Sequence, residues 1–203
     1  VPNSLQISTE LGGHYPLAQA KLTEPAWPGV DLATRSLGPS DAPAETVLFV
    51  GKEWYRKGLD IAVAVCEELR QKRPGLRLVV VGPDPKTISD IARHHWVDCR
   101  GWVENLDYSA VGRLLLHPAR NEPYGMVVAE AMMSGIDVLV SSRCGVVDHY
   151  PQILRLPAEA SVADWARALD AALEAGQPAV YEPWTWSQLA RQTCRIYARI
   201  HCK

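Results

Sequence analysis

The sequence predicts a doubly wound α/β fold, with a parallel sheet of about six strands and helices on both faces. From Thr46 onward, short runs rich in β-branched residues alternate with helical patterns. The runs are apolar throughout, which is typical of strands buried on both faces of a parallel sheet. A chain of 203 residues, 47% of them hydrophobic, is long enough for one such core. We therefore expect ligands at the carboxyl ends of the strands, where the strand order switches.

Strands and helices alternate through the predicted core. Strands are expected at Val47–Val50, Leu76–Val81, Val97–Arg100, Leu114–His117 and Val138–Ser141, with a weaker one near Gln152–Leu156. Helices are expected at Gly58–Arg73, Thr87–Trp96, Tyr124–Ser134 and Val162–Ala175, with a short one at Leu106–Val111. This order favours crossover units that build a parallel sheet.

The N-terminal stretch does not fit this alternation. Residues 1–45 hold six prolines, with a possible strand at Leu5–Ser8, a short helix at Tyr15–Leu22 and a turn at Pro28–Asp31. We expect this part to be the remnant of another domain plus a linker. The chain begins with Val1 rather than methionine, which is consistent with a fragment of a longer protein.

A closing helix is expected at Gln188–His201, with Thr185 or Ser187 as its cap. Trp184 and Trp186 are expected to pack against this helix, or to leave an apolar patch where another domain would dock. The expected division of the chain is 1–45, 46–181 and 182–203.

Composition excludes several classes of protein. A net charge of −2 and a pI near 6.3 do not suggest a nucleic-acid-binding surface. The apolar runs are too short to span a membrane. The cysteines are odd in number and form no C-x-x-C pair, which favours reduced thiols in a cytoplasmic protein. They are Cys66, Cys99, Cys144, Cys194 and Cys202.

Glu130 is the single charge in the apolar segment Tyr124–Ser134, and a second carboxylate, Glu122, precedes it. A charge on a helix that is apolar on all faces is costly unless it meets strong partners. Pro123 and Gly125 suit a tight loop entering a helix, whose first N–H groups attract an anion. A phosphate at the helix start, with Glu130 about 9 Å further along, fits a nucleotide sugar. Alternatively, Glu122 caps the helix and Glu130 reaches a surface edge.

The loop Gly51–Gly58 leads from the first core strand into a helix and carries three cations. Cations at a helix N-terminus oppose its dipole by roughly a few tenths of a kcal/mol each, a penalty that a bound anion reverses. Lys52 and Lys57 are therefore candidates to bind a diphosphate, and Gly51 permits close backbone approach. The alternative is a solvated turn. The Walker and G-x-G-x-x-G spacings are absent.

Two other groups of residues are weaker candidates. His94 and His95, with Asp98 and Cys99 nearby, lack the closed spacing of a zinc site. His117 ends a predicted strand at the ligand edge, where it either touches a ligand or is simply packed.

Together these motifs resemble the C-terminal, donor-binding domain of retaining GT-B glycosyltransferases of the group 1 family. The resemblance covers roughly residues 26–200, and its motifs occur in the family's order. It depends on Phe49–Lys52 followed by Arg56–Gly58, on the E-x7-E motif in Glu122–Met132, and on the trailing helix from Trp186, with support from Pro28–Asp31 and Gly101–Val103. Leu115–Ala119 and Cys144–His149 are most similar to the lipopolysaccharide-core glucosyltransferase branch.

The resemblance implies a role for each site residue. Lys52 and Lys57 would bind the donor diphosphate, Glu122 would hold hydroxyls of the donor sugar, and Glu130 would accept hydrogen bonds from the ribose. Glu122, Lys57 and Lys52 would thus form the catalytic set, with no metal ion or other cofactor. The remaining donor-binding residues would be Gly51, Trp102 and Val103, which face the base end, and Gly125, Met126 and Val127, whose backbone amides serve sugar and phosphate oxygens.

Two departures from the family pattern affect these roles. Lys52 stands where arginine is usual, which keeps the charge but loses the bidentate fork. The family's frequent Gly-Gly-x-x-Glu loop is Cys144–Asp148 here, so donor contacts from that loop are doubtful.

The implied reaction moves a hexose from a nucleoside diphosphate, UDP-glucose being the expected donor, to an acceptor hydroxyl with retained configuration. The helix dipole and the lysines would stabilise the departing diphosphate. The acceptor site would lie in an N-terminal domain that this chain nearly lacks, so we expect donor binding without efficient transfer. The full enzyme would be cytoplasmic, peripheral to the membrane, and active in cell-envelope glycan or lipopolysaccharide synthesis. The alternatives are a stand-alone sugar-nucleotide binding module and a GT-B-like nucleotide-sugar epimerase.

Overall fold

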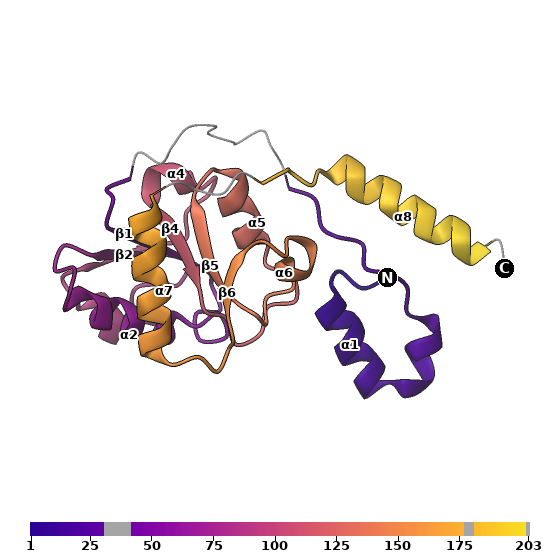
Figure 1. The fold of residues 1–203 in the computed structure, drawn as a ribbon, viewed down its shortest axis with the longest axis horizontal. Coiled ribbons are helices and arrows are strands. Elements are labelled where there is room, and N and C mark those ends of the chain that lie inside the picture. Colours follow the sequence, from indigo (N-terminus) through magenta and orange to yellow (C-terminus); the bar gives the residue numbers. More distant parts are fainter. Residues whose placement is uncertain (31–41, 177–180, 202–203) are drawn as a thin grey trace.

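The computed structural model describes residues 1–30, 42–176 and 181–201. These residues form a six-stranded parallel sheet with strand order β3-β2-β1-β4-β5-β6 (Figure 1). This architecture confirms the predicted fold class. The strands are β1 (Thr46–Val50), β2 (Arg77–Val81), β3 (Val97–Gly101), β4 (Leu114–His117), β5 (Asp137–Ser141) and β6 (Leu154–Leu156).

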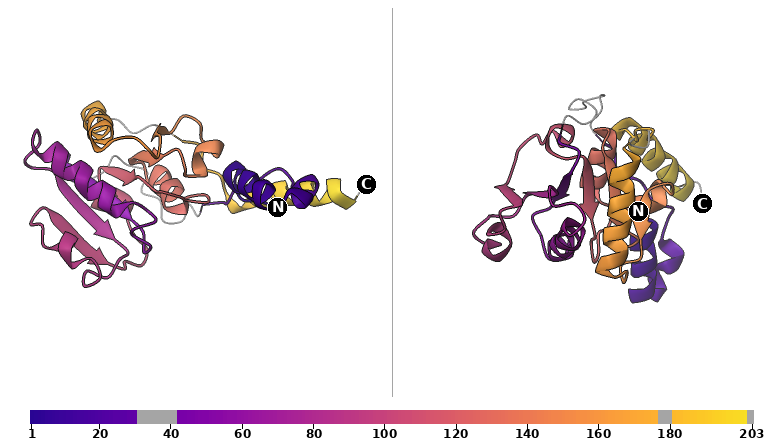
Figure 2. Two further views of the ribbon diagram at one scale, coloured as in Figure 1. Left: turned by 90° about the horizontal axis from the view of Figure 1, so that it is seen from below. Right: turned by 60° about the vertical axis from the view of Figure 1, so that its left-hand side comes forward.

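Helices cover both faces of this sheet, because alternate strand residues point to opposite sides. One face packs against α2 (Leu59–Arg70), α3 (Ser89–Ala92) and α7 (Val162–Ala175). The other face packs against α4 (Tyr108–Val111), α5 (Met126–Met133) and the short helix α6 (Val146–His149). The edge-on view in Figure 2 shows the sheet between these two layers. The strand order reverses between β1 and β4, so a ligand cleft is expected at their carboxyl ends.

The predicted strand at Leu5–Ser8 is wrong. These residues begin α1 (Leu5–His14), whose first turn is capped by Ser4, with its Oγ accepting a 3.2 Å hydrogen bond from Ile7 N. The short helix expected at Tyr15–Leu22 is confirmed as the 3-10 helix η1 (Pro16–Lys21).

Most other boundaries differ by one to three residues from those expected, and α7 begins and ends as predicted. The largest difference is α3, which covers only part of the expected Thr87–Trp96 helix. After α3 the chain turns, with Val97 N donating to His94 O, and this turn places Trp96 in the core.

Two segments, residues 24–30 and 181–186, connect the sheet body to a second group of helices. We call them the crossing segments. Val30 N donates to Trp184 O at 2.8 Å, and Trp184 Nε1 donates to Trp27 O at 2.9 Å. His149 of α6 stacks on Trp27 with ring centroids 5.0 Å apart. The crossing segments are therefore tied both to each other and to the sheet body.

The second group of helices consists of α1, η1 and α8 (Trp186–His201), which lie together beside the sheet body (Figures 1 and 2). Thr185 Oγ1 accepts from Gln188 N and the Gln188 side chain accepts from Thr185 N, so Thr185 is the cap rather than Ser187. Trp184 is half-buried, but Trp186 is 54% exposed. The expected packing of Trp186 against the last helix is therefore wrong.

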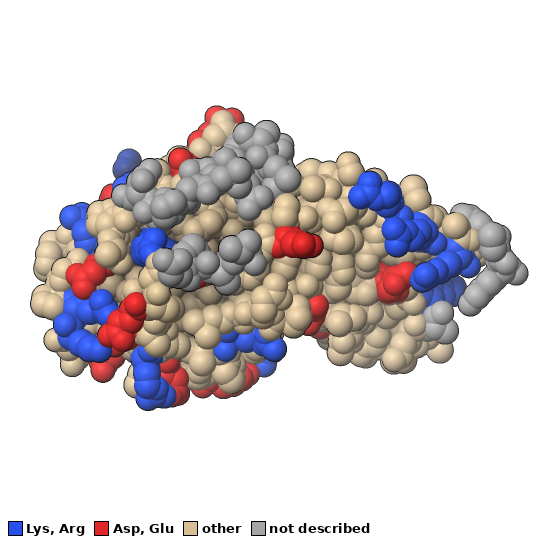
Figure 3. Space-filling view, turned by 45° about the horizontal axis from the view of Figure 1, so that its top comes forward, with Lys and Arg blue, Asp and Glu red and all other residues tan. Residues whose placement is uncertain are grey.

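Charged side chains are distributed unevenly over the surface. On the face in Figure 3, Lys and Arg are mixed with Asp and Glu over the sheet body, whereas basic side chains gather towards the end of α8. That helix carries Arg191, Arg195 and Arg199 and no acidic residue. Among the described residues no helix combines the length and apolar character needed to cross a bilayer.

Candidate functional site

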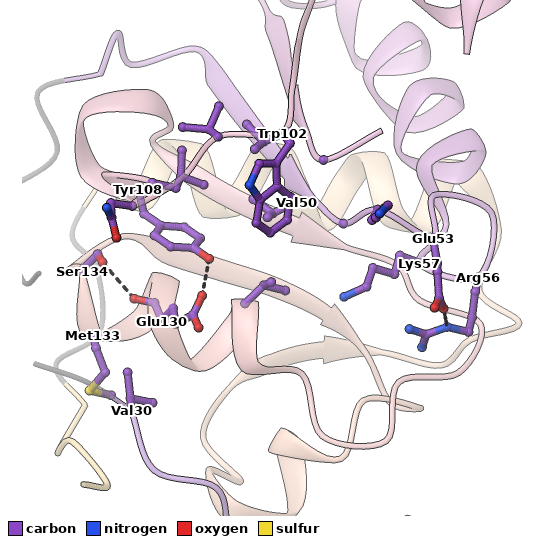
Figure 4. A pocket seen from close by; sticks show the side chains of 18 residues that line it. Val30, Val50, Glu53, Arg56, Lys57, Trp102, Tyr108, Glu130, Met133 and Ser134 are labelled. Carbon is purple, nitrogen blue, oxygen red and sulfur yellow. Dashed lines mark hydrogen bonds and ion pairs between the residues drawn. The ribbon is translucent and has the colours of Figure 1, made fainter. Parts of the chain in front are cut away.

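A cavity of about 580 Å³ opens at the carboxyl ends of β1, β2 and β3, with α5 as its opposite wall (Figure 4). This is the edge at which the reversal in strand order predicts a ligand cleft. Most of the predicted site residues line it: Gly51, Lys52, Lys57, Trp102, Val103, Val127 and Glu130. Of the predicted residues that the structure describes, Glu122, Gly125 and Met126 are outside this lining.

The cationic end of the cavity is the loop between β1 and α2. Lys52 is exposed, whereas the aliphatic part of Lys57 lies on the backbone of Gly51, where an added Cβ would come within 2.1 Å of Lys57 Cδ. Gly58, the N-cap of α2, has φ +80 and packs against Pro118. A side chain at either glycine would disturb Lys57, so both glycines keep the loop closed around the lysine.

Glu122 lies behind Lys57 rather than at the cavity surface. Its Oε2 is 3.0 Å from Lys57 Nζ, 3.5 Å from Arg56 Nη1 and 3.6 Å from Nε2 of the buried His117. Burial opposes ionisation of Glu122, but the approach of His117 and the charge of Lys57 outweigh it and lower the pKa of the carboxyl to about 2. Glu122 is therefore an anion whose charge Lys57 neutralises in the ligand-free protein.

Glu130 lies at the other end of the cavity, on α5. The hydroxyl of Tyr108 on α4 donates a 2.6 Å hydrogen bond to Glu130 Oε2, and the hydroxyl of Ser134 donates to the backbone oxygen of Glu130 (Figure 4). Burial and the nearby carboxylate raise the pKa of Tyr108, so its hydroxyl stays a donor. Sequence reasoning missed Tyr108. The available signal was Asp107, which caps α4 by accepting from Ala110 N.

The start of α5 is built as the sequence predicts, with Gly125 as N-cap at φ +102. Cys144 packs beneath this turn, and a Cβ on Gly125 would come within 2.5 Å of its sulfur. Glu122 N donates to Arg143 O, and Gly145 N donates to Glu122 O. The loop after β5 therefore supports the start of α5 through backbone contacts.

Trp102 and Val103 form the wall beyond β3. Trp102 is 75% exposed, with its ring over the cavity (Figure 4). Asn105, in the same loop, also lines the cavity and has φ 53, a left-handed conformation that asparagine tolerates. An exposed indole beside an apolar wall is a platform on which a flat ring can stack.

Other candidate sites from the sequence find no support in the geometry. Within the described ranges, no three His, Cys, Asp or Glu side chains lie close enough to hold a metal ion together. Cys66, Cys99, Cys144 and Cys194 are unpaired, and Cys202 lies outside the described residues, as does Asp31 of the predicted turn.

The cavity thus combines three features along its length. Lysines stand at one end, the Tyr108–Glu130 pair at the other, and apolar residues with an exposed indole form the walls between them. Lysines attract phosphate oxygens, and a carboxylate accepts hydrogen bonds from hydroxyl groups. An elongated ligand with a charged part and a hydroxylated part matches this arrangement.

Comparisons with known proteins agree with this geometry. The family model described as glycosyl transferases group 1 matches residues 44–175. The chain is 29% identical over 175 residues to a phosphatidylinositol N-acetylglucosaminyltransferase of Homo sapiens, covering 76% of this chain and 36% of that protein. It is 34% identical over 113 residues to the lipopolysaccharide glucosyltransferase WaaG of Escherichia coli, covering 51% of this chain and 29% of that protein.

The fold is also that of solved glycosyltransferases. The structure of HepE from Anabaena in complex with UDP and glucose superposes with a TM-score of 0.75 at 18% identity, covering 97% of this chain and 62% of that one. The chain therefore spans well under two thirds of the length of these relatives. The likeness confirms the expected Rossmann-like architecture of the GT-B type. Because the family model covers most of the sheet body, the chain belongs to the group 1 family of glycosyl transferases.

Proposed function

We propose that this chain binds a nucleoside-diphosphate sugar and serves as the donor-binding part of a retaining glycosyltransferase that transfers a hexose to an acceptor hydroxyl. One observation carries the proposal: Lys52, Lys57 and Glu130, which are far apart in the sequence, line a single elongated cavity. Lys52 and Lys57 bind the diphosphate, Glu130 binds the ribose, and the base lies against Trp102 and Val103.

Glu122 is the residue that holds hydroxyls of the donor sugar in this proposal. It lies next to the cavity behind Lys57, and it reaches the sugar once Lys57 turns towards the diphosphate. The N-terminus of α5 and the lysines stabilise negative charge on the departing diphosphate, which lowers the barrier to loss of the leaving group. The backbone amides of Gly125, Met126 and Val127 add donors at the same helix start.

UDP-glucose is the donor that we propose. In support, one relative is named a lipopolysaccharide glucosyltransferase, and a structural neighbour was solved with UDP and glucose. We further propose that the missing partner is an N-terminal domain with the acceptor site, to which residues 1–45 and 182–203 connect. The whole enzyme then acts in the cytoplasm, at the membrane surface, in cell-envelope glycan synthesis, and needs no metal ion.

Calorimetric titration of the purified chain with UDP-, GDP- and ADP-sugars tests donor binding. We expect one of these ligands to bind, and the Lys52→Ala and Lys57→Met variants to lose about tenfold or more in affinity, since charge-assisted hydrogen bonds contribute about 1.5–3 kcal/mol each. Lys86→Ala is a matched control, because Lys86 is exposed and outside the cavity. Absence of binding to every ligand of the panel would refute the proposal.

The same chain should show little transfer to an acceptor, because the acceptor domain is missing. Appreciable glycosyl transfer by the chain alone would contradict this division of labour. The length of the native gene product distinguishes the stand-alone binding module, since about twice the present length favours the enzyme. Turnover of a free UDP-sugar without acceptor would favour the epimerase instead.

A further inference from the structure

His117, at the end of β4, is wholly buried beside the charged end of the cavity. Neither of its ring nitrogens has a partner at hydrogen-bond distance among the described residues. The nearest charged atom to Nε2 is Glu122 Oε2 at 3.6 Å. A buried polar group without a partner costs about 1–3 kcal/mol. An apolar side chain would avoid this cost, so packing alone does not account for a histidine at this position.

Lys57 is the partner that keeps His117 away from Glu122. The lysine Nζ is 3.0 Å from the shared oxygen Oε2, closer than the Nε2 of His117. Burial lowers the pKa of His117; Glu122 opposes this, and the positive charges of Lys57 and Arg56 add to the lowering. The imidazole is therefore neutral in the ligand-free protein.

The groups that face His117 are few. Arg56 and Lys57 come from the loop after β1, Glu122 from the loop after β4, and Cys144 from the loop after β5. Burial raises the pKa of the Cys144 thiol to about 12, so it stays uncharged. Arg56 also pairs with Glu53, and the two cations therefore balance the two carboxylates.

A bound diphosphate would upset this balance. If Lys57 turns to the phosphates, Glu122 keeps only Arg56, which it shares with Glu53, and the buried group gains a net negative charge. A shift of about 0.6 Å would bring His117 Nε2 to the 3.0 Å typical of an N–H···O bond with Oε2. A protonated imidazole would both restore neutrality and hold the carboxylate in place.

We propose that His117 is a positioning residue for Glu122, which replaces Lys57 as its partner when the donor diphosphate binds and takes up one proton from solvent as it does so. The inference rests on the proposed function. It assigns to His117 no contact with the substrate, and the proton stays on the imidazole while the donor is bound.

Proton uptake fixes the sign of the pH dependence. A ligand that raises the pKa of a group binds more tightly at low pH, and its affinity falls as the pH rises from the pKa of the free protein to that of the complex. Because burial places the free pKa of His117 below its ordinary value, this window begins in mildly acidic solution. Within it the affinity falls by at most about tenfold per pH unit, the limit for one proton.

Titration with UDP-glucose in two buffers of different ionisation enthalpy measures the proton uptake. The diphosphate diester of this ligand does not titrate between about pH 5 and 7.5, unlike the terminal phosphate of UDP. The wild-type chain should take up close to one proton per complex within the window. His117→Asn and Glu122→Gln should each abolish the uptake, whereas His95→Asn, at an exposed site, should leave it unchanged.

NMR titration of the wild-type imidazole resonances gives a second measurement that needs no variant at the buried position. The pKa of His117 should rise when the protein is saturated with UDP-glucose. An unchanged pKa, binding without proton uptake, or uptake that persists in His117→Asn or Glu122→Gln would each overturn the inference while leaving the proposed function intact. If the wild-type chain binds no nucleotide sugar, both fail together.

Discussion

The hydroxyl of Tyr108 donates a 2.6 Å hydrogen bond to the carboxylate of Glu130, and this pair forms one end of the cavity. Tyr108 is buried on α4, whereas Glu130 is partly exposed on α5. The bond therefore anchors a charged side chain that would otherwise move freely in the cavity, and it leaves the carboxylate with capacity for a second donor.

Tyr108→Phe should weaken binding of UDP and of UDP-glucose to a similar extent. The phenyl ring keeps the packing, but Glu130 loses its anchor, so we expect a loss of about 0.5–1.5 kcal/mol, or roughly two- to tenfold in affinity. Calorimetry measures both ligands. Tyr197→Phe on α8, where the side chain is exposed, is the control. Unchanged affinity in the Tyr108 variant would argue against a ribose site at Glu130.

The two carboxylates of the E-x7-E motif should differ in which ligands they affect. Glu130→Ala should weaken UDP as well as UDP-glucose, because the ribose is common to both. Glu122→Ala should weaken mainly UDP-glucose, since it removes the proposed sugar contact but frees Lys57 for the diphosphate. The measurement is the ratio of the two affinities in each variant. Equal losses for both ligands in Glu122→Ala would contradict the assigned role.

Glu122 should also make stability depend on pH. Its pKa is lowered from 4.5 to about 2, so its contribution to folding is complete above pH 4.5 and is lost as the pH falls towards 2. Urea unfolding should show wild type more stable than Glu122→Gln by up to about 3 kcal/mol near neutrality, with the difference shrinking below pH 4.5. Glu67→Gln, at an exposed site on α2, should show no such trend. A difference that does not vary with pH would mean that packing, not charge, is responsible.

Gly58→Ala should destabilise the protein and weaken diphosphate binding. Gly58 has φ +80, and a Cβ would lie 2.2 Å from Pro118 O, so the loop that holds Lys57 must shift. We expect a loss of about 1–3 kcal/mol in the free energy of unfolding. In Gly13→Ala, at a helical position with open space around the added Cβ, the effect should be neutral or stabilising. Thermal unfolding of the two variants compares them directly.

The sheet could be predicted because its strands are apolar on both sides and its helices carry clear end signals. The helix α7 begins at the capping box of Ser161 and Asp164 and ends at Gly176, so both boundaries are encoded locally. The segment Leu5–Ser8 misled because its alternating apolar residues match a strand, while the Ser4 cap that starts a helix is a weaker pattern. Tertiary packing of Trp96 shortened α3, and no local pattern encodes that.

The candidate site could be predicted in part. The lysines and Glu130 line one cavity because the carboxyl ends of parallel strands share an edge, which follows from topology alone. The burial of Glu122 behind Lys57 depends on how two loops from distant parts of the chain cross each other. The same holds for the bond between Tyr108 and Glu130, whose helices meet only in the folded protein. Such pairings are properties of the packed structure rather than of either segment.

The crossing segments constrain how the molecule can bend. Because Trp184 is bonded to both Trp27 and Val30, the two segments form one strap, and neither can swivel without the other. The stack of Trp27 on His149 fixes that strap at α6. A reorientation of the α1, η1 and α8 group relative to the sheet therefore has a single axis, and that axis runs beside the loop that supports the start of α5.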